Sequence, residues 1–300
     1  MSRNGFELVS LSQDPDIVIF NNVSWNNIGK VFKFKSKSKV LIVWESAVTS
    51  PLSHKILIRK QFDLTFISSG SWRCAARELE FVWPQSTETP VEKSLRKRKN
   101  RVAFVARNNI SVAKNENYSF RREIVFKSNL PLDVFGHDWN RSATRSLFLV
   151  LKNMLTQALS GSKISLKGAR LSLAKRLEPT EVVDNKIKKL ADYRFSLVIE
   201  NSSDYVSEKI VDSIIAGCVP IYVGPPLLNF GFPPKIAILS EPSLDGILES
   251  LVRLQSDEAI CQEIVNNGKS FISSVEFSRE FANVAVLKKL ASTISLKLKS

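Results

Sequence analysis

Residues 193–224, YRFSLVIENSSDYVSEKIVDSIIAGCVPIYVG, contain two short apolar runs separated by a stretch with helical spacing. The run at 195–199 predicts a strand, and Asp204 is placed to cap a helix that follows it. Gly217 predicts the end of that helix, because glycine readily adopts the left-handed conformation found beyond a helix C-terminus. A second strand is predicted at 219–223. This order is a βαβ crossover, whose first loop lies at the carboxyl edge of a sheet, where α/β proteins bind their ligands.

The rest of the chain shows the same alternation of short β-branched runs and longer amphipathic stretches. Further strands are predicted at 16–20, 40–44, 63–68, 102–106, 132–135 and 236–239. Helical periodicity predicts helices at 146–159, 182–193, 206–216, 243–255, 257–267 and 278–298. Four of the strand segments are nearly continuous apolar runs, as expected when both faces of a strand are covered. The predicted fold class is therefore α/β with a largely parallel sheet.

The length and the charge bound the function. The 300 residues suffice for about two domains. Lys and Arg number 43 against 29 Asp and Glu, a net charge of +14, so a polyanionic partner or substrate has to be considered. The basic residues cluster at 30–39 and at 96–99, the latter inside a polar segment, 85–101, that predicts an interdomain linker. No known nucleic-acid-binding signature accompanies either cluster, so we expect no specific nucleic-acid partner.

The cysteines and the N-terminus bear on location. Cys74, Cys218 and Cys261 are widely spaced and form no metal-binding or disulfide pattern, which favours a reducing compartment. Neither a signal peptide nor a transmembrane run is found in the sequence. We expect a cytoplasmic protein, with peripheral contact to an anionic inner membrane face as an option for the basic amphipathic helix at 278–298. Packing of that helix across the domains is the alternative.

The loop after the strand at 195–199 carries groups that suit a nucleotide. A helix N-terminus attracts phosphate, and Lys209 would add a full positive charge there. Glu208 could accept hydrogen bonds from ribose hydroxyls. On spacing alone, Glu208 and Lys209 could equally be exposed helix residues, and Glu200 a loop residue.

Residues 193–224 resemble the donor-binding motif of the α1,3-fucosyltransferases. Phe195 is followed by Glu200-Asn201-Ser202, then by DYVSEK at 204–209 and AGCVPIYVG at 216–224. The resemblance implies a GT-B fold, in which two Rossmann-like domains face a cleft. It also implies that the N-terminal domain lacks the first β-α unit of the family. The gap between Ser202 and Asp204 is shorter than in the animal enzymes.

Two further stretches carry the resemblance. FVARNN at 104–109, FRRE at 120–123 and LDVFG at 132–136 are similar to the start of the family's donor domain, and they place the family's diphosphate-binding arginine on Arg121, with Arg122 left open. Upstream, VWES at 43–46 resembles the family's acidic motif and implies that Glu45 is the general base. His54, a little further on, is expected at the surface or in a linker.

The resemblance implies an acceptor-side domain at 1–90, a basic linker at 91–101, a donor domain at 102–275 and a basic helix at 276–300, with an insertion of unassigned role at 140–192. The implied reaction is an inverting transfer of fucose from GDP-fucose to a hydroxyl of an oligosaccharide, in glycan biosynthesis or protein glycosylation. The implied donor-binding residues are Arg121, Glu200, Asn201, Tyr205, Glu208 and Lys209. No metal motif is present, so no metal ion or other cofactor is expected. The alternatives are a transferase for another nucleotide sugar and a non-catalytic basic binding protein on the same scaffold.

Overall fold

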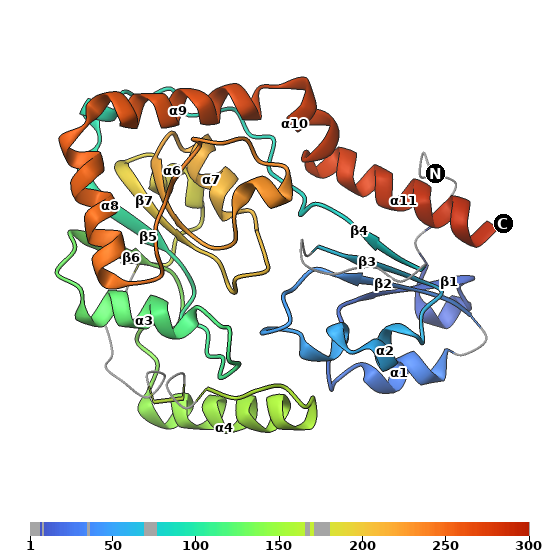
Figure 1. The fold of residues 1–300 in the computed structure, drawn as a ribbon. Coiled ribbons are helices and arrows are strands. Elements are labelled where there is room, and N and C mark those ends of the chain that lie inside the picture. The colour runs from blue at the N-terminus through green and yellow to red at the C-terminus, as the bar shows by residue number, and fades with distance from the viewer. Residues whose placement is uncertain are drawn as a thin grey trace.

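The computed structural model describes residues 7, 9–34, 37–68, 77–165, 169–170 and 181–299. They form two α/β domains, each built on a parallel sheet (Figure 1). The first sheet has the strand order β1-β2-β3-β4 and the second the order β6-β5-β7-β8-β9. The predicted α/β class with two parallel-sheet domains is confirmed.

The N-terminal sheet has a different cover on each face. Its strands are β1 (Ile17–Asn21), β2 (Ser38–Val43), β3 (Leu64–Ile67) and β4 (Glu78–Glu80). The helices of this part are η1 (Leu11–Gln13), α1 (Ile28–Lys33), η2 (Pro51–His54) and α2 (Ile56–Arg59). On one face, Leu41 and Val43 pack against Val31 of α1 and Leu52 of η2. The other face is covered by a helix from the opposite end of the chain.

The second sheet contains the predicted βαβ crossover. Its strands are β5 (Lys99–Val105), β6 (Leu132–Phe135), β7 (Tyr193–Ile199), β8 (Val219–Val223) and β9 (Ile238–Leu239). The elements around it are η3 (Leu95–Lys97), α3 (Tyr118–Lys127), α4 (Ala143–Leu159), α6 (Lys186–Leu190), α7 (Lys209–Ile215), η4 (Leu227–Phe230), α8 (Leu244–Ser256), α9 (Glu258–Ile272) and α10 (Val275–Glu280). Between β7 and its parallel neighbour β8, α7 is almost wholly buried. Gly217 ends the helix with a φ of 71°, as predicted.

The C-terminal stretch predicted as one helix forms two. After α10 the chain turns at Phe281 and Ala282, and α11 (Asn283–Lys299) follows. The backbone of Gln85 donates to the Phe281 carbonyl (2.8 Å) and accepts from Asn283 (2.9 Å), which fixes the turn. Figure 1 shows α11 crossing back over the N-terminal sheet. There Val286, Leu290 and Ile294 are buried against β2 and β3, so the apolar face of this helix packs within the protein.

Some local predictions are corrected. The helix predicted at 206–216 begins only at Lys209, and Asp204 does not cap it but accepts a hydrogen bond from the Ser202 hydroxyl at 2.6 Å. The helix predicted at 182–193 is the short α6. Within the segment expected to be a linker, β5 already begins at Lys99. The sequence prediction missed α1, α2 and β4.

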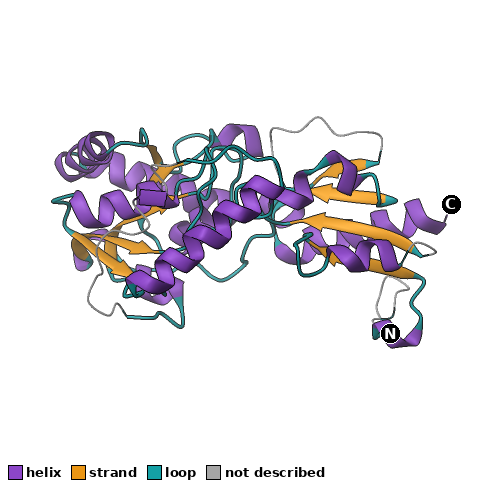
Figure 2. Cartoon of the chain, turned by 90° about the horizontal axis from the view of Figure 1, so that it is seen from below, coloured by secondary structure: helices purple, strands orange, loops and turns teal. Residues whose placement is uncertain are grey.

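The helix α4 also links the two halves of the chain. The long helix α4 lies at the bottom of Figure 1, and therefore in front when the molecule is seen from below (Figure 2). Its Gln157 donates to the carbonyl of Val48, which follows β2.

Cys218 and Cys261 are buried and outside any disulfide, and Cys74 lies outside the described residues.

Candidate active site between the two sheets

A cavity of about 510 Å³ lies where both sheets present the carboxyl ends of their strands. Glu45 follows β2, Arg107 follows β5 and His137 follows β6. The loop after β7 supplies residues from Asn201 to Lys209. Parallel α/β sheets bind ligands at this edge because the loops there do not take part in the backbone hydrogen bonds between strands, while the strands hold the ends of these loops in place. The cavity is therefore the candidate active site.

Glu200 forms the floor of the site beneath the loop after β7. Its side chain has no exposed surface and accepts hydrogen bonds from the Ser207 backbone N–H (3.0 Å) and hydroxyl (2.8 Å). The ammonium of Lys209 lies 3.2 Å from Glu200 Oε2 and 2.6 Å from Ser207 Oγ. A fully buried carboxylate thus fixes the direction of a lysine that lines the cavity, since a buried charge is stable only with partners of this kind.

Arg121 lines the cavity from α3. Its guanidinium donates to the carbonyl of Ile199 and to Asn201 Oδ1 (2.9 Å), and it lies over the Tyr118 ring at 4.9 Å. Burial lowers the pKa of this arginine from its usual high value. The neighbouring Arg122 turns away from the cavity and donates to Asn108 and Asn109. Of the two arginines that the sequence leaves open, only Arg121 contributes to the wall.

Glu208 belongs to a charge network with a lysine that the sequence prediction missed. Lys186 Nζ lies 3.1 Å from Glu208 Oε1 and 2.8 Å from Asp212 Oδ2. Burial opposes ionisation of the Glu208 carboxyl, but Lys209 and Lys186 outweigh it and lower the pKa. Burial likewise lowers the pKa of Lys186, but Glu208 and Asp212 outweigh it and raise the pKa. Both groups are therefore held in their charged forms.

Glu45 faces these cations from the N-terminal domain. Its backbone is fixed twice: Asn22 Oδ1 accepts from the Glu45 N–H (3.3 Å), and His54 Nε2 lies 2.8 Å from the Glu45 carbonyl. Burial raises the pKa of the Glu45 carboxyl, Lys209 opposes the rise and Glu208 adds to it. The expectation of an exposed His54 is wrong, because this side chain is buried behind Glu45.

An aromatic series crosses between the domains beside the site. Trp44 packs edge-on against Trp83 at 5.5 Å between ring centroids, and Trp83 packs edge-on against Tyr205 at 5.5 Å. Tyr205 is buried, which raises its pKa well above the usual value, and negative charges including Glu45 raise it further. The series connects the strand end that carries Glu45 to the loop that carries Glu208 and Lys209.

Six of the seven predicted site residues line this one cavity: Glu45, Arg121, Asn201, Tyr205, Glu208 and Lys209. The seventh, Glu200, lies directly beneath them. The lining residues missed by the prediction include Lys186, Arg107, Gly136, His137 and Trp83. The sequence did hold a signal for Arg107, which belongs to the FVARNN stretch, and for Gly136, where a Cβ would collide with the Ala106 carbonyl at the cavity wall.

The described part of the chain contains no group of three or more His, Cys, Asp or Glu side chains arranged to hold a metal ion. None of the helices within the described ranges is long and apolar enough to cross a membrane.

The fold is that of the GT-B glycosyltransferases. The protein HepE of Anabaena, solved with UDP and glucose, superposes with a TM-score of 0.64 at 11% identity, over 95% of this chain and 79% of that one. An α1,3-fucosyltransferase superposes with a TM-score of 0.56 at 16% identity, over 95% of this chain and 78% of that one. Sucrose-phosphate synthase from Thermosynechococcus elongatus has a TM-score of 0.60 at 11% identity, over 97% and 76%.

In sequence, the chain is similar to a fucosyltransferase-like protein of Arabidopsis thaliana. The two are 26% identical over an alignment of 163 residues, and the match covers 48% of this chain and 31% of that protein. The chain therefore matches only about a third of the length of this curated relative. No protein-family model matches the chain. The resemblance to the fucosyltransferases predicted from the motifs is confirmed by this relative and by the solved structures.

Proposed function

We propose that the protein is an inverting glycosyltransferase that moves fucose from GDP-fucose to a hydroxyl of an oligosaccharide. One observation carries the proposal: a carboxylate of one domain, Glu45, faces Arg121 and Lys209 of the other across a single cavity. A sugar transfer with inversion needs such an arrangement, with a base on the side of the acceptor and positive charge on the side of the leaving group.

The proposed reaction follows from these positions. Glu45 accepts the proton of the acceptor hydroxyl while its oxygen forms a bond to the anomeric carbon. The bond from that carbon to the diphosphate breaks on the opposite face, and GDP leaves with the electron pair. Arg121 and Lys209 stabilise the charge that develops on the diphosphate. The raised pKa of Glu45 strengthens it as a base, provided that it is ionised at the working pH.

The remaining residues are proposed to hold the donor. Glu208 and Tyr205 bind the ribose and phosphates, and Glu200 and Asn201 shape the sugar pocket, Glu200 through its bond to Lys209. Lys186 joins the set because it fixes Glu208. In this scheme fixed side-chain cations supply the charge stabilisation, so the reaction requires no metal ion or other cofactor.

A second candidate is a transferase for a different nucleotide sugar. It is favoured by the finding that HepE, whose fold is similar to that of this chain, was solved with UDP and glucose. A thermal-shift panel with GDP-fucose, GDP-mannose and UDP-glucose separates the two proposals. Stabilisation by the GDP compounds alone supports the GDP site, and stabilisation by UDP-glucose alone would replace it with the second candidate.

The proposal predicts that binding and transfer respond to different residues. Lys209→Ala and Arg121→Ala should weaken GDP binding by at least about tenfold each, because charge-assisted bonds to phosphate contribute about 1.5–3 kcal/mol. Glu45→Gln should bind GDP as the wild type does and transfer no fucose. Lys235→Ala, an exposed lysine paired with Glu263, is the control and should change neither property. Equal GDP affinity in wild type and Lys209→Ala would refute the donor site.

The acceptor and the location are part of the same proposal. We propose an oligosaccharide acceptor and a cytoplasmic site of action. Of the two alternatives for the C-terminal helix, packing is the one observed, because the apolar face of α11 is buried against the N-terminal sheet. A non-catalytic basic binding protein would instead bind polyanions with a steep salt dependence and would gain no stability from GDP.

A further inference from the structure

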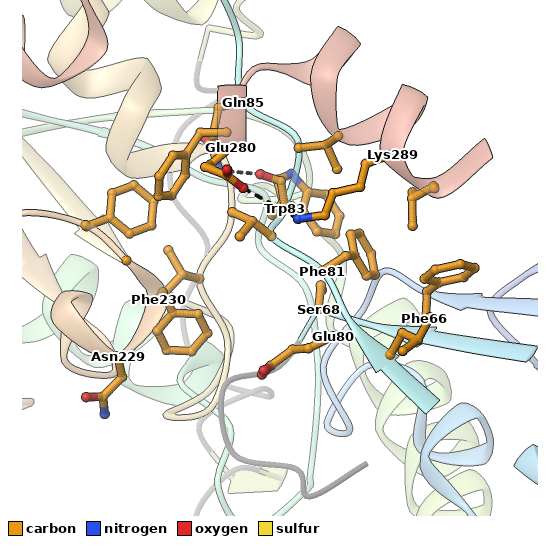
Figure 3. Close-up of a pocket in the computed structure, with 18 of the residues that line it drawn as sticks. Phe66, Ser68, Glu80, Phe81, Trp83, Gln85, Asn229, Phe230, Glu280 and Lys289 are labelled. Carbon is orange, nitrogen blue, oxygen red and sulfur yellow. Dashed lines mark hydrogen bonds and ion pairs between the residues drawn. The ribbon is translucent and has the colours of Figure 1, made fainter. Parts of the chain in front are cut away.

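A second cavity, of about 560 Å³, lies on the far side of Trp83 from the candidate active site. It is enclosed by the end of the N-terminal sheet, the connection after β4, the η4 turn and the helices α10 and α11 (Figure 3). Trp83 belongs to the walls of both cavities. The second cavity is thus separate from the proposed donor site but shares one wall with it.

The walls of this cavity are mainly apolar and aromatic. In Figure 3, Phe230 lies on one side, and Phe81 and Phe66 lie on the other. Leu79, Phe281 and Leu290 belong to the same apolar lining. Cavities of about 300–1,000 Å³ with walls of this kind and a few polar groups are typical small-molecule sites. The volume and the lining together indicate a ring-bearing apolar ligand, because aromatic walls pack well against the faces and edges of rings.

The polar groups at the rim restrict the charge of that ligand. Among the described residues that line the cavity, Glu80, Glu276 and Glu280 supply three carboxylates and Lys289 supplies one ammonium. Glu280 is paired with Arg279 (2.9 Å) and with Lys289 (3.5 Å), so the acidic character of the rim comes from Glu276 and from Glu80, whose pKa burial raises. An acidic rim on a chain of net charge +14 is a local exception. It disfavours phosphates and other anions, and so distinguishes this cavity from the one lined by Arg121 and Lys209.

We propose that the second cavity is a binding site for an uncharged, ring-bearing apolar compound. The ligand would contact β3, β4 and the α11 helix packed on them on one side and η4 and α10 on the other, so it would bridge the two domains. It would also pack against Trp83, which contacts both Trp44 and Tyr205. This proposal does not depend on the proposed function, because the residues that line the second cavity determine which ligand it binds.

The test uses two fluorescent probes that share one ring system. N-phenyl-1-naphthylamine is uncharged, and 8-anilino-1-naphthalenesulfonate carries an added sulfonate. We expect saturable binding of the uncharged probe in the presence of saturating GDP, and binding of the sulfonate to this site at least about tenfold weaker because of the acidic rim. Displacement of the uncharged probe by GDP would place it in the other cavity and overturn the proposal.

Filling the cavity gives the decisive comparison. Thr293 lines the cavity from α11, and Ser292, its neighbour on the same helix, is exposed and outside the lining. Thr293→Trp should weaken the uncharged probe by at least about tenfold, and Ser292→Trp should leave it within about twofold of wild type. Asn229→Trp, with Leu228→Trp as its control, repeats the comparison from the opposite wall if Thr293→Trp does not fold. Unchanged probe affinity in the folded filling variants would overturn the proposal.

Discussion

Glu200→Gln tests whether the floor of the candidate site positions Lys209. Glutamine keeps the size of the side chain, and its oxygen can still accept from the Ser207 backbone N–H. Its amide nitrogen is a donor and would face the Lys209 ammonium in place of Oε2. The Ser207 hydroxyl can turn to accept from that nitrogen, but an ammonium has no acceptor capacity, so Lys209 loses this partner.

The cost follows from the geometry of that one bond. A hydrogen bond between charged groups contributes about 1.5–3 kcal/mol net. Because 22% of the Lys209 side chain is exposed, water can partly replace the lost carboxylate, and we expect the lower end, about 1.5 kcal/mol of folding stability. If Lys209 contacts the diphosphate, an ammonium that Glu200 no longer holds in position should also bind GDP more weakly, by about tenfold, or about 1.4 kcal/mol.

Calorimetric titration with GDP and thermal unfolding measure the two effects separately. Glu249→Gln, a substitution at an exposed position on α8, is the matched control and should change neither. A Glu200→Gln protein that keeps the GDP affinity and the melting temperature of wild type would refute the positioning role. A lower melting temperature with unchanged GDP affinity would leave Glu200 a role in folding only.

Two further predictions concern the base and the returning helix. Because burial raises the pKa of Glu45, transfer activity should be lost on acidification at a pH above the pKa of about 4.3 that is typical of glutamate. A pH profile of kcat/KM measures this loss. A midpoint at or below that value would contradict the assignment of Glu45 as the base. Leu290→Ala on α11 should cost about 2–5 kcal/mol of folding stability in chemical denaturation, because it opens a hole against the N-terminal sheet, whereas Leu287→Ala, half exposed on the same helix, should cost about 0.5 kcal/mol or less.

The sequence predicts those parts of the fold in which local signals agree with the tertiary structure. The strand predicted at 219–223 matches β8, whose apolar run is buried on both faces. The strand predicted at 132–135 matches β6, an edge strand in which Phe135 is buried and the other three residues are half-buried. The break between α10 and α11 was missed because apolar spacing continues across it, while the bonds that fix the turn come from the distant Gln85. β4 was missed because three residues, Glu78–Glu80, become a strand only by pairing with β3.

The candidate site likewise contains residues that local sequence predicts and residues that only tertiary contacts reveal. Most of its residues belong to motifs of contiguous sequence, which lie at strand ends and are brought together by the parallel sheets. The sequence prediction missed Lys186 because its partners, Glu208 and Asp212, lie more than 20 residues away and give no local pattern. His54 was expected at the surface because the sequence around a single histidine does not indicate its tertiary contact, here the backbone carbonyl of Glu45.

The buried cations change what the net charge of +14 implies. Among the residues that the structure describes, six Lys and Arg side chains are buried, namely Lys39, Arg59, Arg98, Arg121, Arg122 and Arg141. Several of them donate to backbone carbonyls, as Arg98 does to Ala216 (2.7 Å) at the end of α7. These charges cannot reach a large polyanion, so the surface is less basic than the sequence suggests.

Arg121 and Lys209 are the cations best placed to meet a small anion, and both are largely shielded from solvent ions. Raising the salt concentration from about 0.1 M to about 1 M shortens the Debye length from about 10 Å to about 3 Å, which weakens exposed charge pairs much more than buried ones. GDP affinity, measured by titration in sodium chloride, should therefore fall by less than about tenfold over this range. A steep loss, as for a protein that releases many counterions from a polyanion, would instead place the anion on the exposed basic clusters and contradict a buried diphosphate site.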